Sequence, residues 1–284
     1  MKDGKWITDV HTHSTFSHDG VSRFEDMLET ARKKGVDFYG VAEHFNHDTY
    51  VDANDEISPL IDVEAYFHTA RHLQEDYAGV MNVLVGAEFG YTDELTRQNA
   101  YVEVYEKYRP DFVVNSIHSL YGVDYYFLRP YYRQSENGER VARDRLETYR
   151  EYLAVVRRSL DATYPYDIVG HIGYAARYAP YQDKEMHYAG LEAEYDDILK
   201  TIIKKDKILE VNGAAKDLPS GCVPARSVLE RYYALGGRKI SYASDAHSTE
   251  HVARRREEIV KILKEIGFTY LTVPCRGEHI KVDL

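Results

Sequence analysis

Cysteine is scarce in this chain of 284 residues, where only Cys222 and Cys275 occur. Two cysteines without a CxxC pair exclude a disulfide scaffold and a thiolate zinc site. Long apolar runs are also missing, since no stretch approaches the ~20 residues of a membrane helix. The N-terminus, MKDGKWITDV, has no apolar signal-peptide core. We therefore expect a cytoplasmic protein that has no membrane partner.

Basic residues are in the minority, because 36 Lys and Arg face 47 Asp and Glu and the net charge is −11. Binding to nucleic acid depends on neutralising phosphates with basic side chains, so a nucleic-acid partner is not expected. A small phosphorylated substrate remains compatible with this charge if bound metal ions supply positive charge locally.

Tyrosine, by contrast, is abundant, with 26 copies. Many lie in the segment 121–132, YGVDYYFLRPYY. Three interpretations stay open for it: a lid over a site, the interface of a homo-oligomer, or tyrosines used as hydrogen-bonded core residues.

Short apolar runs typical of buried strands alternate with amphipathic helical patterns along the chain. This alternation predicts parallel βαβ units in a single domain, 1–284, and seven such units favour a closed or nearly closed barrel. After a first strand in ITDVHTH, strands are expected at 37–43, 82–89, 111–117, 167–172, 207–212 and 239–244. Helices are expected at 22–35, near 62–77, up to about 108, near 140–161, near 188–204, at 224–235 and at about 250–265. The segment between the fourth and fifth strands is a long insertion, and a short run, FTYLTV, follows the last helix.

The apolar runs end in His, Glu or Asp, and in α/β barrels the working residues lie at the carboxyl ends of the strands. A lone histidine there is more often a satisfied polar residue than a ligand, but the joint pattern favours a metal cluster. His11 and His13 are two residues apart and point to the same side of a strand, and Asp245 and His247 repeat the spacing. The candidate metal ligands are His11, His13, Asp19, His44, Glu88, His118, His171, Asp245 and His247.

Nine nitrogen and oxygen donors suffice for two or three ions if Glu88 bridges, and a set without thiolate suits Zn, Mn or Fe. Clustered divalent ions generate hydroxide at neutral pH and stabilise both the attacking and the leaving oxygen of a phosphoryl transfer. The expected reaction is therefore phosphoester hydrolysis.

The motifs DVHTHSTFSHDG, AEH, GAEFG, NSIHSL, GHIGY, LEVNG and YASDAH together resemble the PHP (polymerase and histidinol phosphatase) family, and most closely its histidinol-phosphatase branch. The resemblance implies a distorted seven-stranded (β/α) barrel that holds three divalent metal ions at the carboxyl ends of its strands. It assigns His11, His13, Glu88 and Asp245 to one ion. It assigns Glu88, His118 and His171 to the second, and Asp19, His44 and His247 to the third. Asp19, rather than His18, matches the family position.

The same resemblance implies hydrolysis of L-histidinol phosphate to L-histidinol and phosphate, a step of histidine biosynthesis. A metal-bridging hydroxide would attack phosphorus, and Asp245, His247 or metal-bound water is a candidate to protonate the leaving oxygen. Arg177 and Lys216, and more weakly Arg129, are candidate substrate-binding residues. Asp124 and nearby tyrosines could face the substrate amine and imidazole.

Three alternatives stay open. The substrate could be another small phosphomonoester, a nucleotide or a DNA end. Members of the amidohydrolase superfamily also open on HxH, but they typically use a carboxylated Lys as a bridging ligand, and none of the runs here ends in Lys. The chain could also be a non-catalytic metal-binding PHP interaction module; the nine filled ligand positions argue against this.

Overall fold

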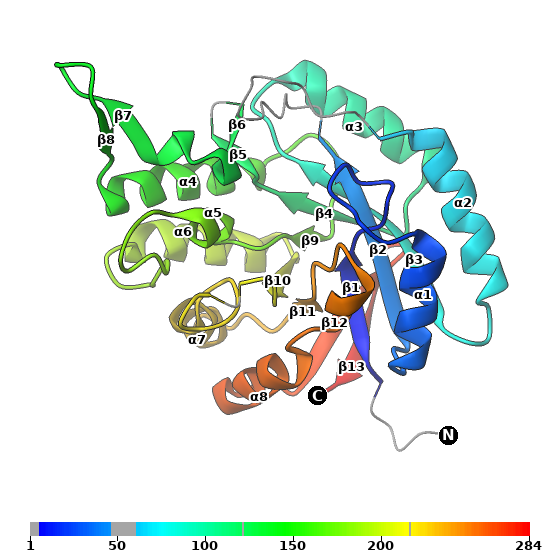
Figure 1. Ribbon diagram of the computed structural model, residues 1–284. Helices are drawn as coiled ribbons and strands as arrows, with labels where there is room; N and C mark the ends of the chain where they lie inside the picture. Colours follow the sequence, from blue (N-terminus) through cyan, green and yellow to red (C-terminus); the bar gives the residue numbers. More distant parts are fainter. Residues whose placement is uncertain (1–5, 47–60, 121, 216) are drawn as a thin grey trace.

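A parallel sheet of seven strands forms the centre of the molecule (Figure 1). The computed structural model describes residues 6–46, 61–120, 122–215 and 217–284. In spatial order, the strands are β1 (Thr8–Thr12), β2 (Phe38–Phe45), β3 (Asn82–Gly90), β4 (Phe112–Ser116), β9 (Ile168–Val169), β10 (Ile208–Asn212) and β11 (Ile240–Ala243). All seven predicted strands are present, but the fifth, β9, has two residues where six were expected.

The first and last strands of this sheet meet, so the sheet curls into a barrel. Thr12 and Ala246 form a parallel bridge. The His13 amide donates to the Ala246 carbonyl at 2.8 Å, and the Asp245 amide donates to the His11 carbonyl at 2.9 Å. Because this seam is short, the barrel is nearly closed, and the predicted barrel fold is confirmed.

Alternation along the strands creates two cores, one on each face of the curled sheet. On β2, Tyr39 and Val41 point outward to the helices, whereas Phe38 and Ala42 point into the barrel. The helices that cover the outer face are α1 (Phe24–Lys33), α2 (Val63–Asp76), α3 (Leu95–Tyr108), α4 (Arg145–Ser159), α6 (Glu192–Lys204), α7 (Arg226–Ala234) and α8 (Arg256–Ile266). All seven were predicted. In the described residues, no helix is long and apolar enough to cross a membrane.

Several elements were not predicted. A short helix, α5 (Tyr174–Tyr178), follows β9 directly. The insertion forms two small hairpins. The first pairs β5 (Ser119–Leu120) with β6 (Val123–Asp124), and the second pairs β7 (Tyr132–Gln134) with β8 (Arg140–Ala142). Two 3-10 turns, η1 (Tyr125–Phe127) and η2 (Arg129–Tyr131), lie between the hairpins in the chain. A third 3-10 turn, η3 (Thr249–His251), precedes α8. The β7–β8 hairpin projects from the body at the upper left of Figure 1.

The chain ends in an antiparallel hairpin, β12 (Tyr270–Cys275) with β13 (Glu278–Asp283). The FTYLTV run indicated only a short segment here. Val273 and Val282 of the hairpin join the inner core. The Arg276 amide donates to the Asp111 carbonyl at 2.7 Å, directly before β4 begins. The hairpin therefore closes the barrel at the end where the strands start.

Most of the large buried side chains are tyrosines: among the described residues, they make up eleven of the twelve largest fully buried ones. Several of their hydroxyls donate to backbone carbonyls, as Tyr66 does to Gly86 at 2.7 Å and Tyr101 does to Gly90 at 2.6 Å. Such partners remove the cost of burying a hydroxyl. The interpretation as hydrogen-bonded core residues therefore holds for Tyr66 and Tyr101, and Tyr125 of the insertion is likewise buried in the core.

Candidate metal centre

The inward face of the strands changes from apolar to polar at one level of the barrel. On β2 the inward series starting at Phe38 ends in His44, and on β3 the series starting at Leu84 ends in Glu88. His44 and Glu88 are paired in register across the two strands. Both still lie inside their strands, whereas the sequence pattern placed them where each strand leaves the core.

Aromatic packing forms the floor under this polar level. A Cβ atom added to Gly86 would lie 2.3 Å from the Phe112 ring, and one added to Gly40 would lie 2.9 Å from it. Glycine at both positions therefore leaves room for Phe112 to fill the barrel interior. The polar side chains sit on a packed base from which water is excluded.

Glu88 occupies the centre of the polar cluster and has no exposed surface. Its carboxylate oxygens lie near four imidazole nitrogens, those of His44 (2.6 Å), His171 (2.9 Å), His118 (3.2 Å) and His11 (3.4 Å). Burial alone would raise the pKa of Glu88, but the surrounding histidines hold it well below its ordinary value. An ionised carboxylate with imidazoles around both oxygens suits a bridging ligand.

The HxH pair lies beside Glu88. The Nε2 atoms of His11 and His13 are 3.1 Å apart, and His13 Nε2 lies 3.4 Å from Asp245 Oδ1. Burial, together with the neighbouring His44 and His247, lowers the pKa of His13 well below its usual value. Neutral imidazole is the form that binds metal ions.

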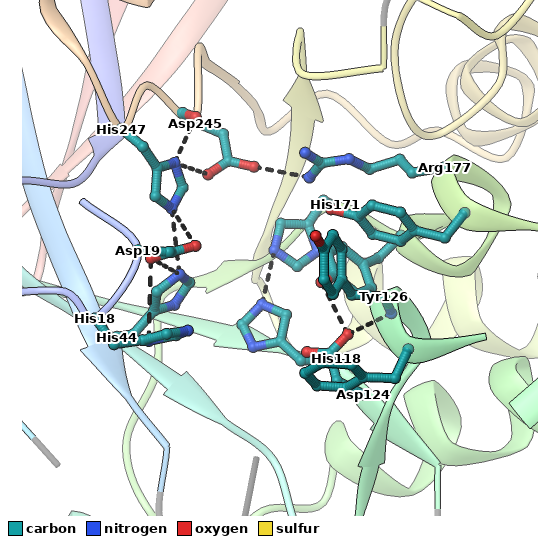
Figure 2. Close-up of a pocket in the computed structure, with 13 residues that line it drawn as sticks. His18, Asp19, His44, His118, Asp124, Tyr126, His171, Arg177, Asp245 and His247 are labelled. Atoms are coloured by element: carbon teal, nitrogen blue, oxygen red, sulfur yellow. Dashed lines mark hydrogen bonds and ion pairs between the residues drawn. The ribbon is translucent and has the colours of Figure 1, made fainter. Parts of the chain in front are cut away.

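Asp19, His44 and His247 form the outer part of the cluster (Figure 2). Asp19 lies 3.2 Å from His247 Nε2 and 3.5 Å from His44 Nε2, and the two imidazole nitrogens are 3.3 Å apart. His18 lies next to Asp19, with its Nδ1 4.0 Å from the Asp19 carboxylate, and it also lines the pocket.

The spacing of these donors fits divalent metal ions. Two nitrogens bound to one tetrahedral zinc ion at about 2.0–2.1 Å lie roughly 3.3 Å apart. The imidazole pairs His11–His13, His118–His171 and His44–His247 are 3.1, 3.3 and 3.3 Å apart, respectively. Three groups of donors converge closely enough to hold an ion: His11, His13 and Asp245; His44, Glu88 and His118; and His13, His44 and His247. All nine predicted ligands thus lie in one continuous cluster of nitrogen and oxygen donors.

Sequence reasoning did not assign a role to Glu210, a fully buried residue behind the cluster. Its carboxylate lies 2.7 Å from His11 Nδ1, and it accepts hydrogen bonds from the His171 amide at 3.1 Å and from Asn212 Nδ2 at 3.0 Å. It therefore orients one imidazole and fixes the backbone of another. The available signal was an acidic residue inside the apolar run KILEVN.

Glu43 is a second unassigned residue. It is buried next to His44 and accepts hydrogen bonds from the hydroxyls of Ser14 and Ser17, each at 2.5 Å. Ser17 Oγ in turn lies 3.1 Å from His13 Nδ1 and accepts from the His44 amide at 3.0 Å. Glu43 thereby ties the loop after β1 to β2 and orients His13. The acidic residue that precedes His44 in AEH was the signal.

A pocket of about 350 Å³ opens above the cluster. Its lining includes Arg177, whose Nη1 donates to Asp245 at 3.1 Å. Arg129 is exposed and lines a different hollow, against η2 and α4, so the structure does not bring it to the cluster. Lys216 lies outside the described residues.

Comparison with known proteins identifies the family. The model of the PHP domain matches residues 9–214. The chain belongs to the PHP domain family. The predicted resemblance is thereby confirmed. Seven of the nine clustered donors lie within residues 9–214, and the other two, Asp245 and His247, follow this segment.

Relatives of this PHP protein match it over nearly its whole length. A probable histidinol-phosphatase of Thermotoga maritima is 31% identical, with 94% of this chain and 95% of the relative covered. The histidinol-phosphatase of Lactococcus lactis is 25% identical, with coverage of 92% and 91%. Among solved structures, histidinol phosphate phosphatase of L. lactis, complexed with zinc, L-histidinol and phosphate, superposes with a TM-score of 0.83 at 23% identity and covers 98% of this chain and 99% of its own.

Proposed function

We propose that this PHP protein is a metal-dependent phosphomonoesterase that hydrolyses L-histidinol phosphate to L-histidinol and phosphate. The observation that carries the proposal is the cluster at the base of a pocket that also holds Arg177: seven donors converge in groups that could hold an ion, and Asp19 and His171 lie within 3.2 Å of them. The full-length similarity to histidinol-phosphatases supports the choice of substrate. Histidine biosynthesis is the pathway in which this reaction takes place.

Three divalent ions, Zn, Mn or Fe, are the proposed cofactors. One would bind His11, His13, Glu88 and Asp245; another Glu88, His118 and His171; and the third Asp19, His44 and His247. When bound, such ions polarise phosphoryl oxygens and lower the pKa of water, which provides the nucleophile for hydrolysis. The donor set without thiolate fits these metals.

The protein side chains supply binding and proton transfer. Arg177 is proposed to bind a phosphoryl oxygen, because its guanidinium faces the pocket and stays charged there. Burial lowers its pKa, but Tyr178 and the Asp245 carboxylate raise it above the ordinary value overall. Asp245 and His247 both line the pocket, and one or the other is the proposed donor of the proton to the leaving oxygen. Lys216 remains a proposed phosphate ligand, while Arg129 would reach the substrate only through a rearrangement of the insertion.

Substrate preference tests the proposal. The Zn- or Mn-loaded enzyme is expected to release phosphate from L-histidinol phosphate with kcat/KM at least about 100-fold above that for nucleotides and sugar phosphates, because a site built around polar groups of one substrate rejects those that lack its partners. Equal, slow rates across the panel would contradict histidinol phosphate as the substrate and leave a general phosphomonoesterase. Absence of phosphate release from every ester would instead favour the metal-binding interaction module.

A further inference from the structure

The pocket has two chemically different sides. One side carries the histidine and carboxylate cluster with Arg177, which suits a phosphoryl group. The other side carries Asp124 among the aromatic residues Tyr126, Phe127, Tyr174 and Tyr178. Figure 2 shows Asp124 and Arg177 well separated across the pocket. A ligand that fills the pocket therefore meets a second anionic group beyond the phosphate-binding side.

Asp124 is buried, with 2% of its surface exposed. Its Oδ1 accepts a hydrogen bond from the Tyr126 amide at 2.7 Å and another from the Tyr174 hydroxyl at 3.2 Å. Burial raises the pKa of this carboxyl despite the nearby His118, which shows that the site disfavours an uncompensated negative charge. A cationic ligand group would provide the missing compensation.

The aromatic rings around Asp124 form a wall that extends as far as Arg177, whose guanidinium carbon lies 5.4 Å from the Tyr174 ring centroid and 5.5 Å from that of Tyr178. Tyr174 and Tyr178 pack edge to face with their centroids 5.3 Å apart, and Tyr178 packs in the same way on Tyr126 at 5.4 Å. Tyr126 is 61% exposed and so stands at the mouth of the pocket. Aromatic faces attract ammonium and imidazolium groups.

We propose that Asp124 is a specificity-determining residue that selects phosphomonoesters with a protonated amino group near the ester, while Tyr126, Tyr174 and Tyr178 form the wall along the rest of the molecule. This inference rests on the proposed function and deepens it. L-Histidinol phosphate has its ammonium group on the carbon next to the phosphorylated CH₂. Sugar phosphates without an amino group would leave Asp124 buried and uncompensated.

The variant Asp124→Asn isolates the charge of this residue. Asparagine keeps an oxygen that can accept from the Tyr126 amide and the Tyr174 hydroxyl, but it removes the negative charge. Asp144→Asn is the matched control, because Asp144 caps α4 by accepting from the Glu147 amide at 2.9 Å and is exposed outside the pocket lining. The two substrates to compare are L-histidinol phosphate and its desamino analogue, which differ only in the amino group.

In the wild type and in Asp144→Asn, kcat/KM is expected to favour the amino substrate by about 10–100-fold, the worth of a charge-assisted hydrogen bond of about 1.5–3 kcal/mol. In Asp124→Asn this ratio should fall towards one. The ratio is independent of the fraction of protein that folds. An unchanged ratio in Asp124→Asn, or the absence of a preference in the wild type, would overturn the assignment.

Calorimetric binding of L-histidinol separates this inference from the proposed function, because it requires no turnover. Its Kd is expected to rise about 10–100-fold in Asp124→Asn, while the Kd of inorganic phosphate changes little. Equal binding of L-histidinol by both proteins would overturn the inference even if histidinol phosphate is the substrate. Loss of L-histidinol and phosphate binding together would also overturn it, since Asp124 would then act only on the structure of the pocket.

Discussion

Carboxylates hold the imidazoles of the metal centre from two directions. Glu88 lies among the imidazole nitrogens that face the pocket, while Glu210 contacts the opposite nitrogen of His11 and the backbone of His171. A carboxylate behind a metal-binding histidine fixes its tautomer and raises its basicity. The affinity of the site for metal should therefore depend on residues that never touch an ion.

The substitution Glu210→Gln tests this dependence. Glutamine can still accept from the His171 amide, but it presents no anion to His11 Nδ1, so the affinity for Zn or Mn is expected to fall about 10–100-fold. Competition with a chromogenic chelator measures the affinity directly. Glu185→Gln is a suitable control, because Glu185 is a buried glutamate that accepts from the Ser220 amide and lies outside the pocket lining. Equal metal affinity in the two variants would show that Glu210 has no such role.

At the scale of elements, the C-terminal hairpin depends on one buried carboxylate. Asp111 precedes β4 and accepts hydrogen bonds from Arg276 of the hairpin at 2.7 Å, from Arg71 of α2 at 2.8 Å and from the Val85 amide of β3 at 2.9 Å. Burial would raise the pKa of Asp111, but Arg276, Val85 and Arg71 together lower it below its ordinary value. The ionised group thus joins three elements at the start of the barrel.

Asp111→Asn is expected to lower the free energy of unfolding by about 1–3 kcal/mol, the cost of weakening buried charge-assisted hydrogen bonds. Because the folded pKa is lowered, this stabilisation is fully present above the ordinary carboxyl pKa of about 3.9 and is lost as the pH falls below it. Denaturant titration at neutral and at acidic pH, in chelator, measures the difference between variant and wild type. Asp161→Asn, which weakens exposed ion pairs with Arg157 and Lys205, should change stability by less than about 1 kcal/mol. A difference for Asp111→Asn that grows on acidification would contradict the assignment.

The elements that the sequence predicted are those with a strong local pattern. The apolar runs of β2 and β3 and the apolar stripe of α1 determine their own structure through burial, and the polar residue at the end of each run marked the cluster correctly. The β12–β13 hairpin was missed because its position depends on Val273, Val282 and Arg276, which pack against the distant start of the barrel. Contacts of that kind leave no periodic signal in the local sequence.

The candidate site was also predicted only where the local sequence carries a pattern. Its histidine and carboxylate donors share one chemistry, and most of them share one position on a strand, so they could be recognised together. Glu210 escaped assignment because its partner, His11, is 199 residues away in the sequence. Asp124 could be named only as one acidic residue in a tyrosine-rich insertion; its place opposite Arg177 depends on how η1 and α5 pack, which no local pattern indicates.

At the scale of the whole molecule, a chain of net charge −11 brings seven of its 13 imidazoles and Arg177 to one end of a nearly closed barrel. Association into a homo-oligomer remains a prediction, as does the exclusion of nucleic acid that the charge suggests. The barrel brings β1 and β11 together, and with them His13 and Asp245. The centre therefore forms only when both ends of the sheet are in place, and metal binding should stabilise the closed fold.

Metal titration of the chelated protein tests the central claim most directly. Phosphate release from L-histidinol phosphate is recorded as Zn or Mn is added, with bound metal measured in the same samples and Glu88→Ala as the control. We expect negligible release without metal, a rise that follows binding to a plateau at three ions per chain, and neither binding nor release in the variant. Full activity in the metal-free protein, or in Glu88→Ala with normal metal content, would contradict it.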